Sequence, residues 1–213
     1  MSLTKISRNQ YTIIDPFNWT PPCTLEIKFS TCDGGRGGDY WNNPTLLGIE
    51  RTGVDGDWAI AVINGYLYIW SGDGHYSHYS GKLVNDGQPH TVRICVDVQS
   101  KATIYVDGVY ASKISWNKPY GTSYLGYNGV HGSALIQAPT TWYYIKFVNQ
   151  YITDPRIDKS DCSAHYTWDS DGNMIKNGVA IKKLGWGKYD DITLDLTSHP
   201  SYNHNLDLYG KKK

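Results

Sequence analysis

The chain has 213 residues, which is long enough for one large β-sandwich or for a sandwich with an appended segment. Its 20 Lys+Arg and 20 Asp+Glu give a formal net charge of +0, so it lacks the basic surface that nucleic-acid-binding and anionic-membrane-binding proteins use. The 9 prolines, the 22 glycines and the lack of a long helical or membrane-spanning apolar pattern predict an all-β protein.

Tyrosine and tryptophan dominate the aromatic residues, with 18 Tyr and 8 Trp against 3 Phe. Each of these rings has an apolar face and a polar atom, so it suits a hydrated surface on which a ligand stacks. The alternative is a tyrosine-rich sandwich without a binding role.

The first clearly patterned strand covers residues 23–30, after a short strand over 11–14. Apolar and polar residues alternate through it, which predicts one buried and one polar face. Cys23 and Cys32 flank this strand and would lie roughly 30 Å apart. We therefore expect Cys23 and Cys32 to be free, partly buried thiols rather than to form a disulfide with each other. The other two cysteines of the chain are Cys95 and Cys162.

The glycine-rich segment 33–43 reads DGGRGGDYWNN and predicts a loop. Its glycines do not form a phosphate-binding motif, because no Lys-Ser/Thr and no helix follow them. Loops on a rigid scaffold often carry function, and this one holds Tyr40 and Trp41. We interpret it as a candidate ligand loop; an ordinary hairpin connection is the alternative.

Residues 58–70 predict a β-hairpin, because Asn64-Gly65 fits a two-residue type I′ turn that fixes the register. One face of the hairpin is apolar and belongs to a core. The other pairs small alanines with large rings, namely Ala59 with Trp70 and Ala61 with Tyr68. Tyr68 and Trp70 could form a sugar-stacking platform, or they could fill a core or lie beneath a covering loop.

Two further loops lie near this hairpin in sequence. The first, over 73–79, contains Asp73 and His75 and lacks a metal-binding histidine motif, so we expect a polar loop beside the aromatic platform. The second, over 116–124, offers Trp116 and Tyr120 as contacts at the rim of the site.

Residues 88–110 predict a second antiparallel hairpin that ends in an Asp107-Gly108 turn. This stretch resembles the laminin-G-like and pentraxin-like branch of the concanavalin A-like lectin sandwiches. The residues that carry the resemblance are Gly87, His90, Val92, Tyr105, Val106, Asp107 and Gly108.

The resemblance extends over roughly residues 10–158, because 123–126 is similar to a "leu-x-ile-Gly" strand and 142–152 to the closing strand. It implies an antiparallel two-sheet jelly-roll sandwich over 1–158. Residues 159–213 would then be a C-terminal β extension, made of extra strands or acting as a docking or oligomer arm. Within it, Asp169–Asn173 is interpreted as a hairpin turn rather than a calcium loop, because the bidentate Glu position would be Ala180.

Laminin-G-like relatives often bind calcium at the sandwich rim, so the resemblance makes calcium a candidate ligand. Asp33, Asp39 and Asp73 are the candidate metal ligands, and no cofactor is required by the sequence.

Relatives of this fold also include glycoside hydrolases and polysaccharide lyases. Glycoside hydrolysis generally needs two carboxylates that flank one bond. The only two glutamates, Glu26 and Glu50, fall on different predicted strands, and the motifs of laminarinase-type enzymes and alginate lyases are absent. We therefore do not expect an enzyme.

The function predicted from sequence is a lectin-like module that binds a glycan or polysaccharide by ring stacking and serves adhesion or receptor binding. Because a single such site is weak, several copies on a particle or cell would be needed. The alternative is a structural or decoration protein of a phage-like particle, in which the sandwich forms homo-oligomers or packs against virion subunits. We expect an extracellular or virion-surface location, although the N-terminus lacks the apolar core of a secretion signal.

Overall fold

The computed structural model describes residues 4–6, 10–50, 56–72, 76–119, 123–130, 132–154, 156–169, 172–181 and 187–188. Regular structure within these ranges is almost entirely β-strand, with three short 3-10 helices (η1, Tyr40–Asn42; η2, Gly132–Ala134; η3, Lys159–Asp161). The all-β prediction is therefore confirmed. No helix in the described part of the chain is long and apolar enough to span a bilayer.

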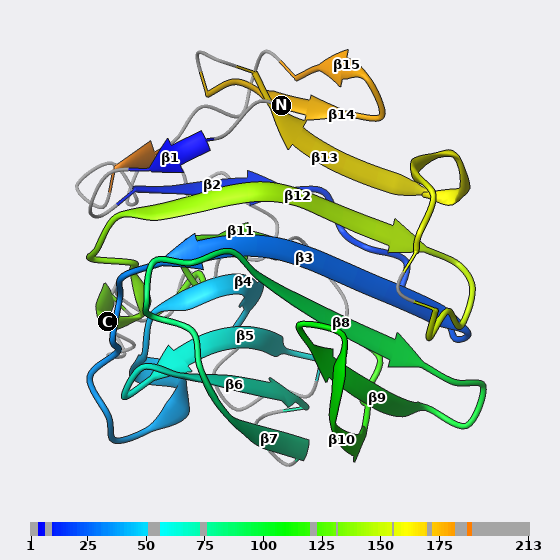
Figure 1. Cartoon of the computed structure of the whole chain (residues 1–213), viewed down its shortest axis with the longest axis horizontal. Helices are drawn as coiled ribbons and strands as arrows, with labels where there is room; N and C mark the ends of the chain where they lie inside the picture. The colour runs from blue at the N-terminus through cyan, green and yellow to red at the C-terminus, as the bar shows by residue number, and fades with distance from the viewer. Residues whose placement is uncertain are drawn as a thin grey trace, which may run out of the picture.

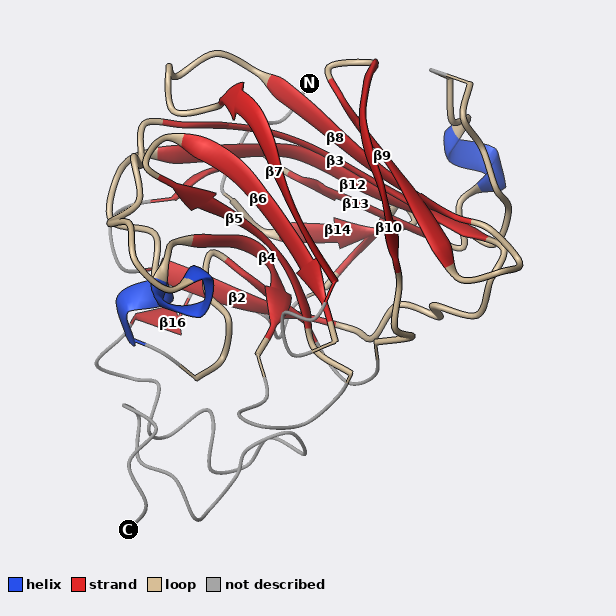
Figure 2. Cartoon of the chain, turned by 90° about the horizontal axis from the view of Figure 1, so that it is seen from below, coloured by secondary structure: helices blue, strands red, loops and turns tan. Residues whose placement is uncertain are grey.

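Two antiparallel sheets lie face to face (Figures 1 and 2). The first contains β1 (Thr4–Ile6), β3 (Cys23–Thr31), β8 (His90–Val96), β9 (Lys101–Val106), β10 (Val109–Ser115), β12 (Thr140–Val148), β13 (Ala164–Trp168), β14 (Met174–Lys176) and β15 (Val179–Ala180). The second contains β2 (Gln10–Ile14), β4 (Thr45–Ile49), β5 (Trp58–Ile63), β6 (Tyr66–Ser71), β7 (Tyr76–Leu83), β11 (Ser123–Leu125) and β16 (Gly187–Lys188).

The strand order among the described residues is β10-β9-β8-β3-β12-β13-β14-β15 in the nine-stranded sheet, with β1 also paired to β12. In the seven-stranded sheet the order is β16-β2-β11-β4-β5-β6-β7. Hairpin neighbours alternate with pairs that are distant in sequence, such as β8 with β3, β3 with β12 and β2 with β11, because the chain passes repeatedly between the two layers. This arrangement confirms the predicted jelly-roll sandwich.

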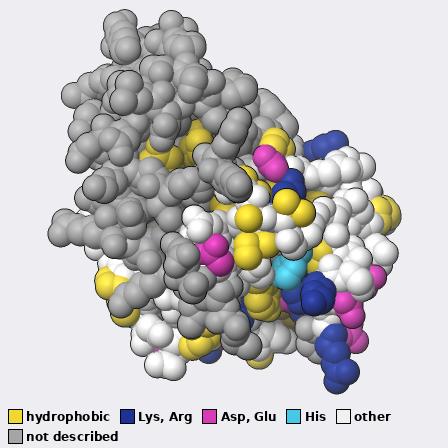
Figure 3. Space-filling view, turned by 90° about the horizontal axis from the view of Figure 1, so that it is seen from above, with side chains coloured by type: hydrophobic (Ala, Val, Ile, Leu, Met, Phe, Trp, Pro, Cys, Tyr) yellow, Lys and Arg dark blue, Asp and Glu magenta, His cyan; other side chains and the backbone are white. Residues whose placement is uncertain are grey.

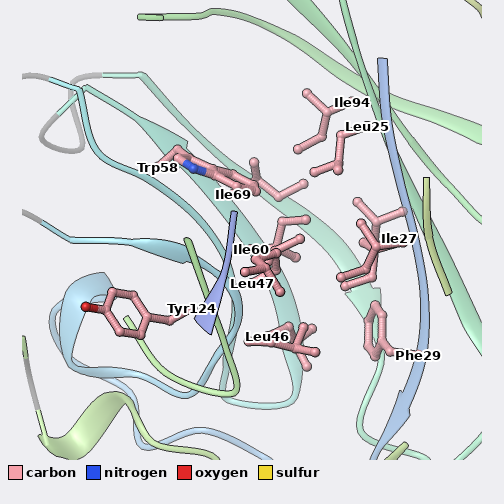
Figure 4. Packing of buried hydrophobic residues seen from close by; sticks show 14 of the residues in the cluster. Leu25, Ile27, Phe29, Leu46, Leu47, Trp58, Ile60, Ile69, Ile94 and Tyr124 are labelled. Atoms are coloured by element: carbon pink, nitrogen blue, oxygen red, sulfur yellow. The ribbon is translucent and has the colours of Figure 1, made fainter. Parts of the chain in front are cut away.

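The core lies between the two sheets and follows the period-two pattern of the sequence. Leu25, Ile27 and Phe29 of β3 face Leu47 and Ile60 of the opposite sheet, and all five are fully buried (Figure 4). Burying one such side chain stabilises the fold by about 1.5–3 kcal/mol. The core therefore holds the two layers together and leaves their outer faces for other roles.

The predicted hairpin turns are present. Asn64 and Gly65 have φ values of 51° and 83°, as a type I′ turn requires, and β5 pairs with β6 in the expected register. Asp107 and Gly108, with φ values of 52° and 77°, turn the chain between β9 and β10 in the same way.

The outer face of the nine-stranded sheet contains a buried ion pair between Glu26 and Arg93. The Tyr144 hydroxyl donates a hydrogen bond to the other oxygen of Glu26 at 2.9 Å. Arg93 also donates to the carbonyl oxygens of Thr153 and Asp154, so it attaches the segment after β12 to this face. One of the two glutamates therefore has a structural role.

Residues 164–180 extend the nine-stranded sheet. β13 pairs with β12, and β14 and β15 continue outward from it. β13 and β14 pair on either side of Asp169–Asn173, as the predicted hairpin turn requires. This part of the extension therefore consists of extra strands. All four cysteines are free thiols, as expected for Cys23 and Cys32.

Candidate functional site

The glycine-rich loop over residues 32–44 lies on the outer face of the β5–β6 hairpin. The Gly65 N–H donates to the Gly34 carbonyl, and the Val62 N–H donates to the Pro44 carbonyl at 2.9 Å. Gly35 has a φ of 69°, and a Cβ at this position would overlap the Val62 carbonyl. The glycines thus allow the loop to approach the hairpin closely.

Asn43 holds the loop in one conformation. Its side chain is completely buried, and its Oδ1 accepts hydrogen bonds from the backbone N–H groups of Arg36 and Gly37 at 2.8 and 3.1 Å. Its Nδ2 donates to the carbonyl oxygens of Gly37 and Asp39 at 3.1 and 2.7 Å. One side chain therefore satisfies four backbone groups of the segment that leads into η1.

Two contacts fix η1 from the other side. Asn128 Nδ2 donates to the Trp41 carbonyl at 2.8 Å, and the Ser133 hydroxyl donates to Asn42 Oδ1 at 3.0 Å. Tyr40 and Trp41 thus stand on a backbone that is held at both ends, as a pre-organised binding site requires.

The rings of Tyr40, Trp41 and Tyr68 form one half-buried cluster, which we call the aromatic surface. The Tyr40 ring stacks on Tyr68 with centroids 5.9 Å apart and an interplanar angle of 19°. Trp41 meets Tyr40 edge to face at 4.7 Å. The exposed Asp39 is the residue before η1. The cluster combines ring faces with polar groups at its edge.

Trp70 lies beneath this cluster and is fully buried, so it does not present a ring for stacking. It packs against the small residues Ala59 and Ala61 of β5 and is covered by Tyr40, whose ring centroid lies 4.9 Å from that of Trp70. Of the alternatives that the sequence leaves open, the structure therefore places Trp70 under a covering loop. Its indole N–H has no hydrogen-bond partner among the described residues.

Trp116 is not at the rim of the site, and this expectation was wrong. The ring is 2% exposed and packs in the core against Trp19, at 5.1 Å, and Trp58, at 6.2 Å. Trp116 directly follows β10 and belongs to the core between the sheets.

The candidate calcium ligands do not come together in the described part of the chain. Asp33 is buried, and its two oxygens accept hydrogen bonds from the N–H groups of Gly35 and Gln137 at 3.1 and 2.6 Å. Within the described ranges, no group of three His, Cys, Asp or Glu side chains is arranged to hold a metal ion. Asp73, His75 and Tyr120 lie outside the described residues.

Sequence reasoning missed Asn43, Asn128 and Ser133. Asn43 follows a Gly-rich run, where an asparagine commonly bonds to nearby backbone, so a local signal existed for it. Asn128 and Ser133 reach η1 from segments about 90 residues away in sequence, and only the fold brings them to the site.

No family model matches the chain, and no curated protein matches it. Solved structures do match. A candidate carbohydrate binding protein from Bacteroides ovatus ATCC 8483 has a TM-score of 0.60 at 15% identity, over 89% of this chain and 61% of that one. The native heptameric SAP-like pentraxin from Limulus polyphemus has a TM-score of 0.52 at 10% identity, over 88% of this chain and 95% of that one.

The LG1-3 region of the laminin alpha2 chain is also similar, with a TM-score of 0.51 at 11% identity over 86% of this chain. The chain spans 29% of that laminin region and 61% of the Bacteroides protein, so it corresponds to part of each. At these identities the likeness concerns the fold. The chain therefore has the concanavalin A-like jelly-roll fold, which it shares with laminin G-like domains and pentraxins.

Proposed function

We propose that the chain is a non-catalytic carbohydrate-binding module that holds a glycan against the aromatic surface. The observation that carries this proposal is the rigid mounting of Tyr40 and Trp41 by Asn43. A sugar ring has an apolar C–H face and a hydroxyl rim, which match an aromatic ring face and nearby polar groups. The side chain of Asp39 and the phenols of Tyr40 and Tyr68 would bind the hydroxyls.

The fold likeness supports the same assignment. One structural neighbour is itself a candidate carbohydrate binder, and its similarity covers 89% of this chain. Because one fold hosts many functions, the assignment depends on the site rather than on this likeness.

The state of Glu26 supports the non-catalytic part of the proposal. Both of its carboxylate oxygens are engaged, by Arg93 and by the Tyr144 hydroxyl, and the side chain is buried. A general acid or base must reach the substrate, and this carboxylate faces protein groups instead.

One stacked ring contributes on the order of 1 kcal/mol, so a single site would bind weakly. Several copies on a particle or cell surface would raise the avidity, as adhesion requires. We propose this setting, including a virion surface, as the one in which the module works.

The test is a glycan-array screen of the purified protein and two variants. Trp41→Ala should lower the signal of every hit, by about fivefold in affinity for one lost ring. The matched control is Tyr143→Ala, which removes a half-buried ring from β12 in the other sheet. A folded protein without hits, or hits that Trp41→Ala leaves unchanged while Tyr143→Ala removes them, would overturn the assignment to this surface.

A further inference from the structure

A second group of aromatic rings, two exposed and one half-buried, lies on the outer face of the other sheet. Tyr105 of β9, Tyr110 of β10 and Tyr151 in the segment after β12 form this group, which we call the tyrosine surface. Tyr110 and Tyr151 are 60% and 40% exposed, and the Tyr105 and Tyr110 rings meet edge to face at 6.3 Å. Among the described residues, Tyr110 and Tyr151 are the tyrosines that belong to the exposed large hydrophobic side chains.

The tyrosine surface is rigidly built. The Tyr151 hydroxyl lies 3.1 Å from Oγ1 of Thr103, which holds the ring across β9. On either side of Tyr151, the Gln150 carbonyl accepts from the Thr24 hydroxyl at 2.7 Å, and the Ile152 N–H donates to that same hydroxyl at 3.0 Å. Further along, Arg93 holds Thr153 and Asp154. The segment carrying Tyr151 is therefore fixed to the sheet before any ligand arrives.

Two cations near these rings have carboxylate partners. Lys113 Nζ lies 3.0 Å from Asp97 Oδ2, and Arg93 pairs with Glu26. Burial raises the pKa of the Tyr105 phenol, with the Cys95 thiol and the Tyr151 phenol acting in the same direction, so this phenol remains a neutral donor at physiological pH. Lys101 of β9 donates to the Ser115 hydroxyl at 2.7 Å. With Lys113 and Arg93 balanced by carboxylates, the surface offers mainly ring faces and hydroxyls, which favours an uncharged ligand.

A peptide strand would add at the edge strand β10 rather than on the tyrosine surface, which lies on the face of the sheet. β9 is hydrogen-bonded to β8 on one side and to β10 on the other, so its face presents side chains only. A peptide that binds by strand addition needs an open sheet edge. A sugar chain needs ring faces and hydroxyl partners, and these are what the face provides. On the face that Figure 3 shows, charged and hydrophobic side chains of the described residues are interspersed.

We propose that the tyrosine surface is a second binding surface for a neutral polysaccharide, so that one copy of the module holds two segments of glycan. The inference rests on the proposed function, because it assumes the same ligand class. The aromatic surface lies on the outside of the seven-stranded sheet and the tyrosine surface on the outside of the nine-stranded sheet. Because these sheets are the two layers of the sandwich (Figure 2), the two surfaces face away from each other. Such a module would cross-link polysaccharide chains.

The test is native gel electrophoresis of the whole chain in gels that contain mixed-linkage β-glucan, xylan or galactomannan, together with turbidity of the same mixtures. Tyr110→Ala/Tyr151→Ala should reduce retardation roughly tenfold or more on a polymer that engages both surfaces, and it should abolish turbidity. Trp41→Ala should do the same. Val98→Ser, at a 75% exposed position of the β8–β9 turn, is the control and should behave as wild type.

The outcomes separate the two proposals. If Tyr110→Ala/Tyr151→Ala matches wild type while Trp41→Ala loses binding, the second surface is refuted and the proposed function stands. If only the double variant loses binding, the tyrosine surface stands and the aromatic surface is refuted. Wild type that none of these three neutral polysaccharides retards refutes the inference, whereas the glycan array still decides the proposed function. A wild-type dimer that the double variant converts to monomer, measured by light scattering, assigns the rings to a protein contact and also refutes the inference.

Discussion

His90 Nδ1 lies 2.9 Å from Asp107 Oδ2, which joins the start of β8 to the turn between β9 and β10. On the opposite side of the ring, Nε2 lies 3.0 Å from Asp86 Oδ1. The imidazole is thus held between two carboxylates from different segments. Lys82 of β7, in the other sheet, forms an ion pair with Asp107, with Nζ 3.5 Å from Oδ2.

The contacts of His90 with Asp86 and Asp107 predict how the free energy of unfolding depends on pH. Burial acts to raise the pKa of Asp107, but hydrogen bonds from His90 and the Thr91 N–H outweigh it, and the net pKa is lowered. The pKa of Asp86 is lowered by the Gln88 N–H and by His90. A carboxyl group whose pKa is lower in the folded state stabilises the protein above its unfolded value, near 3.9, and loses that effect as the pH falls through the folded value.

We therefore expect the free energy of unfolding to decrease as the pH drops below about 4. Chemical denaturation of Asp107→Asn across this range should show a shallower decrease than wild type, because one of the responsible carboxylates is gone. Asp161→Asn, at an exposed position, is the control. Equal acid dependence in wild type and Asp107→Asn would refute the assignment.

Asn43→Ala should impair binding and stability together. The change leaves four backbone groups of the loop without their partner, at a cost of about 2–3 kcal/mol of unfolding free energy. The ligand affinity should fall further than stability alone predicts, because Tyr40 and Trp41 lose their support. Asn173→Ala, which removes an exposed hydrogen bond to Asp169 in the turn between β13 and β14, serves as the control. Calorimetric titration of folded Asn43→Ala with wild-type affinity would contradict the role of the loop.

Removing one partner of the buried Glu26–Arg93 pair should destabilise the protein by about 3–5 kcal/mol, because an uncompensated charge remains in the interior. Glu26→Met/Arg93→Met should cost less than the sum of the single changes. A double-mutant cycle by chemical denaturation measures the coupling, and additive single effects would rule it out. Arg93→Met should in addition loosen the segment that carries Tyr151.

Thiol reactivity should rank the cysteines by exposure. Burial raises the pKa of Cys23 to about 12, with a contribution from Cys95, and raises the pKa of Cys95 to about 11. Because the thiolate is the reactive form, neither should react with an aromatic disulfide reagent at pH 8 until the protein unfolds. The exposed Cys32 should react first, and Cys32→Ser should remove that phase. A fast phase that survives this change would show the ranking to be wrong.

The parts of the fold that sequence predicts depend on contacts close along the chain. The Asn64-Gly65 and Asp107-Gly108 turns fix their hairpins within a few residues, and alternation assigns the apolar faces. The burial of Trp70 is different, because the same alternation describes a ring in solvent and a ring under a loop. Only the placement of Tyr40, about 30 residues earlier, decides between them. Trp116 was misplaced for a related reason, since no local pattern shows where a chain leaving β10 turns inward.

The four hydrogen bonds of Asn43 also bear on the kinetics of recognition. Loop 32–44 becomes ordered when the chain folds, so a ligand does not have to order it. A ligand that meets the site should then bind without a prior change in the loop. All ligands that fit should therefore have similar association rates. Discrimination among glycans would reside in the lifetime of each complex.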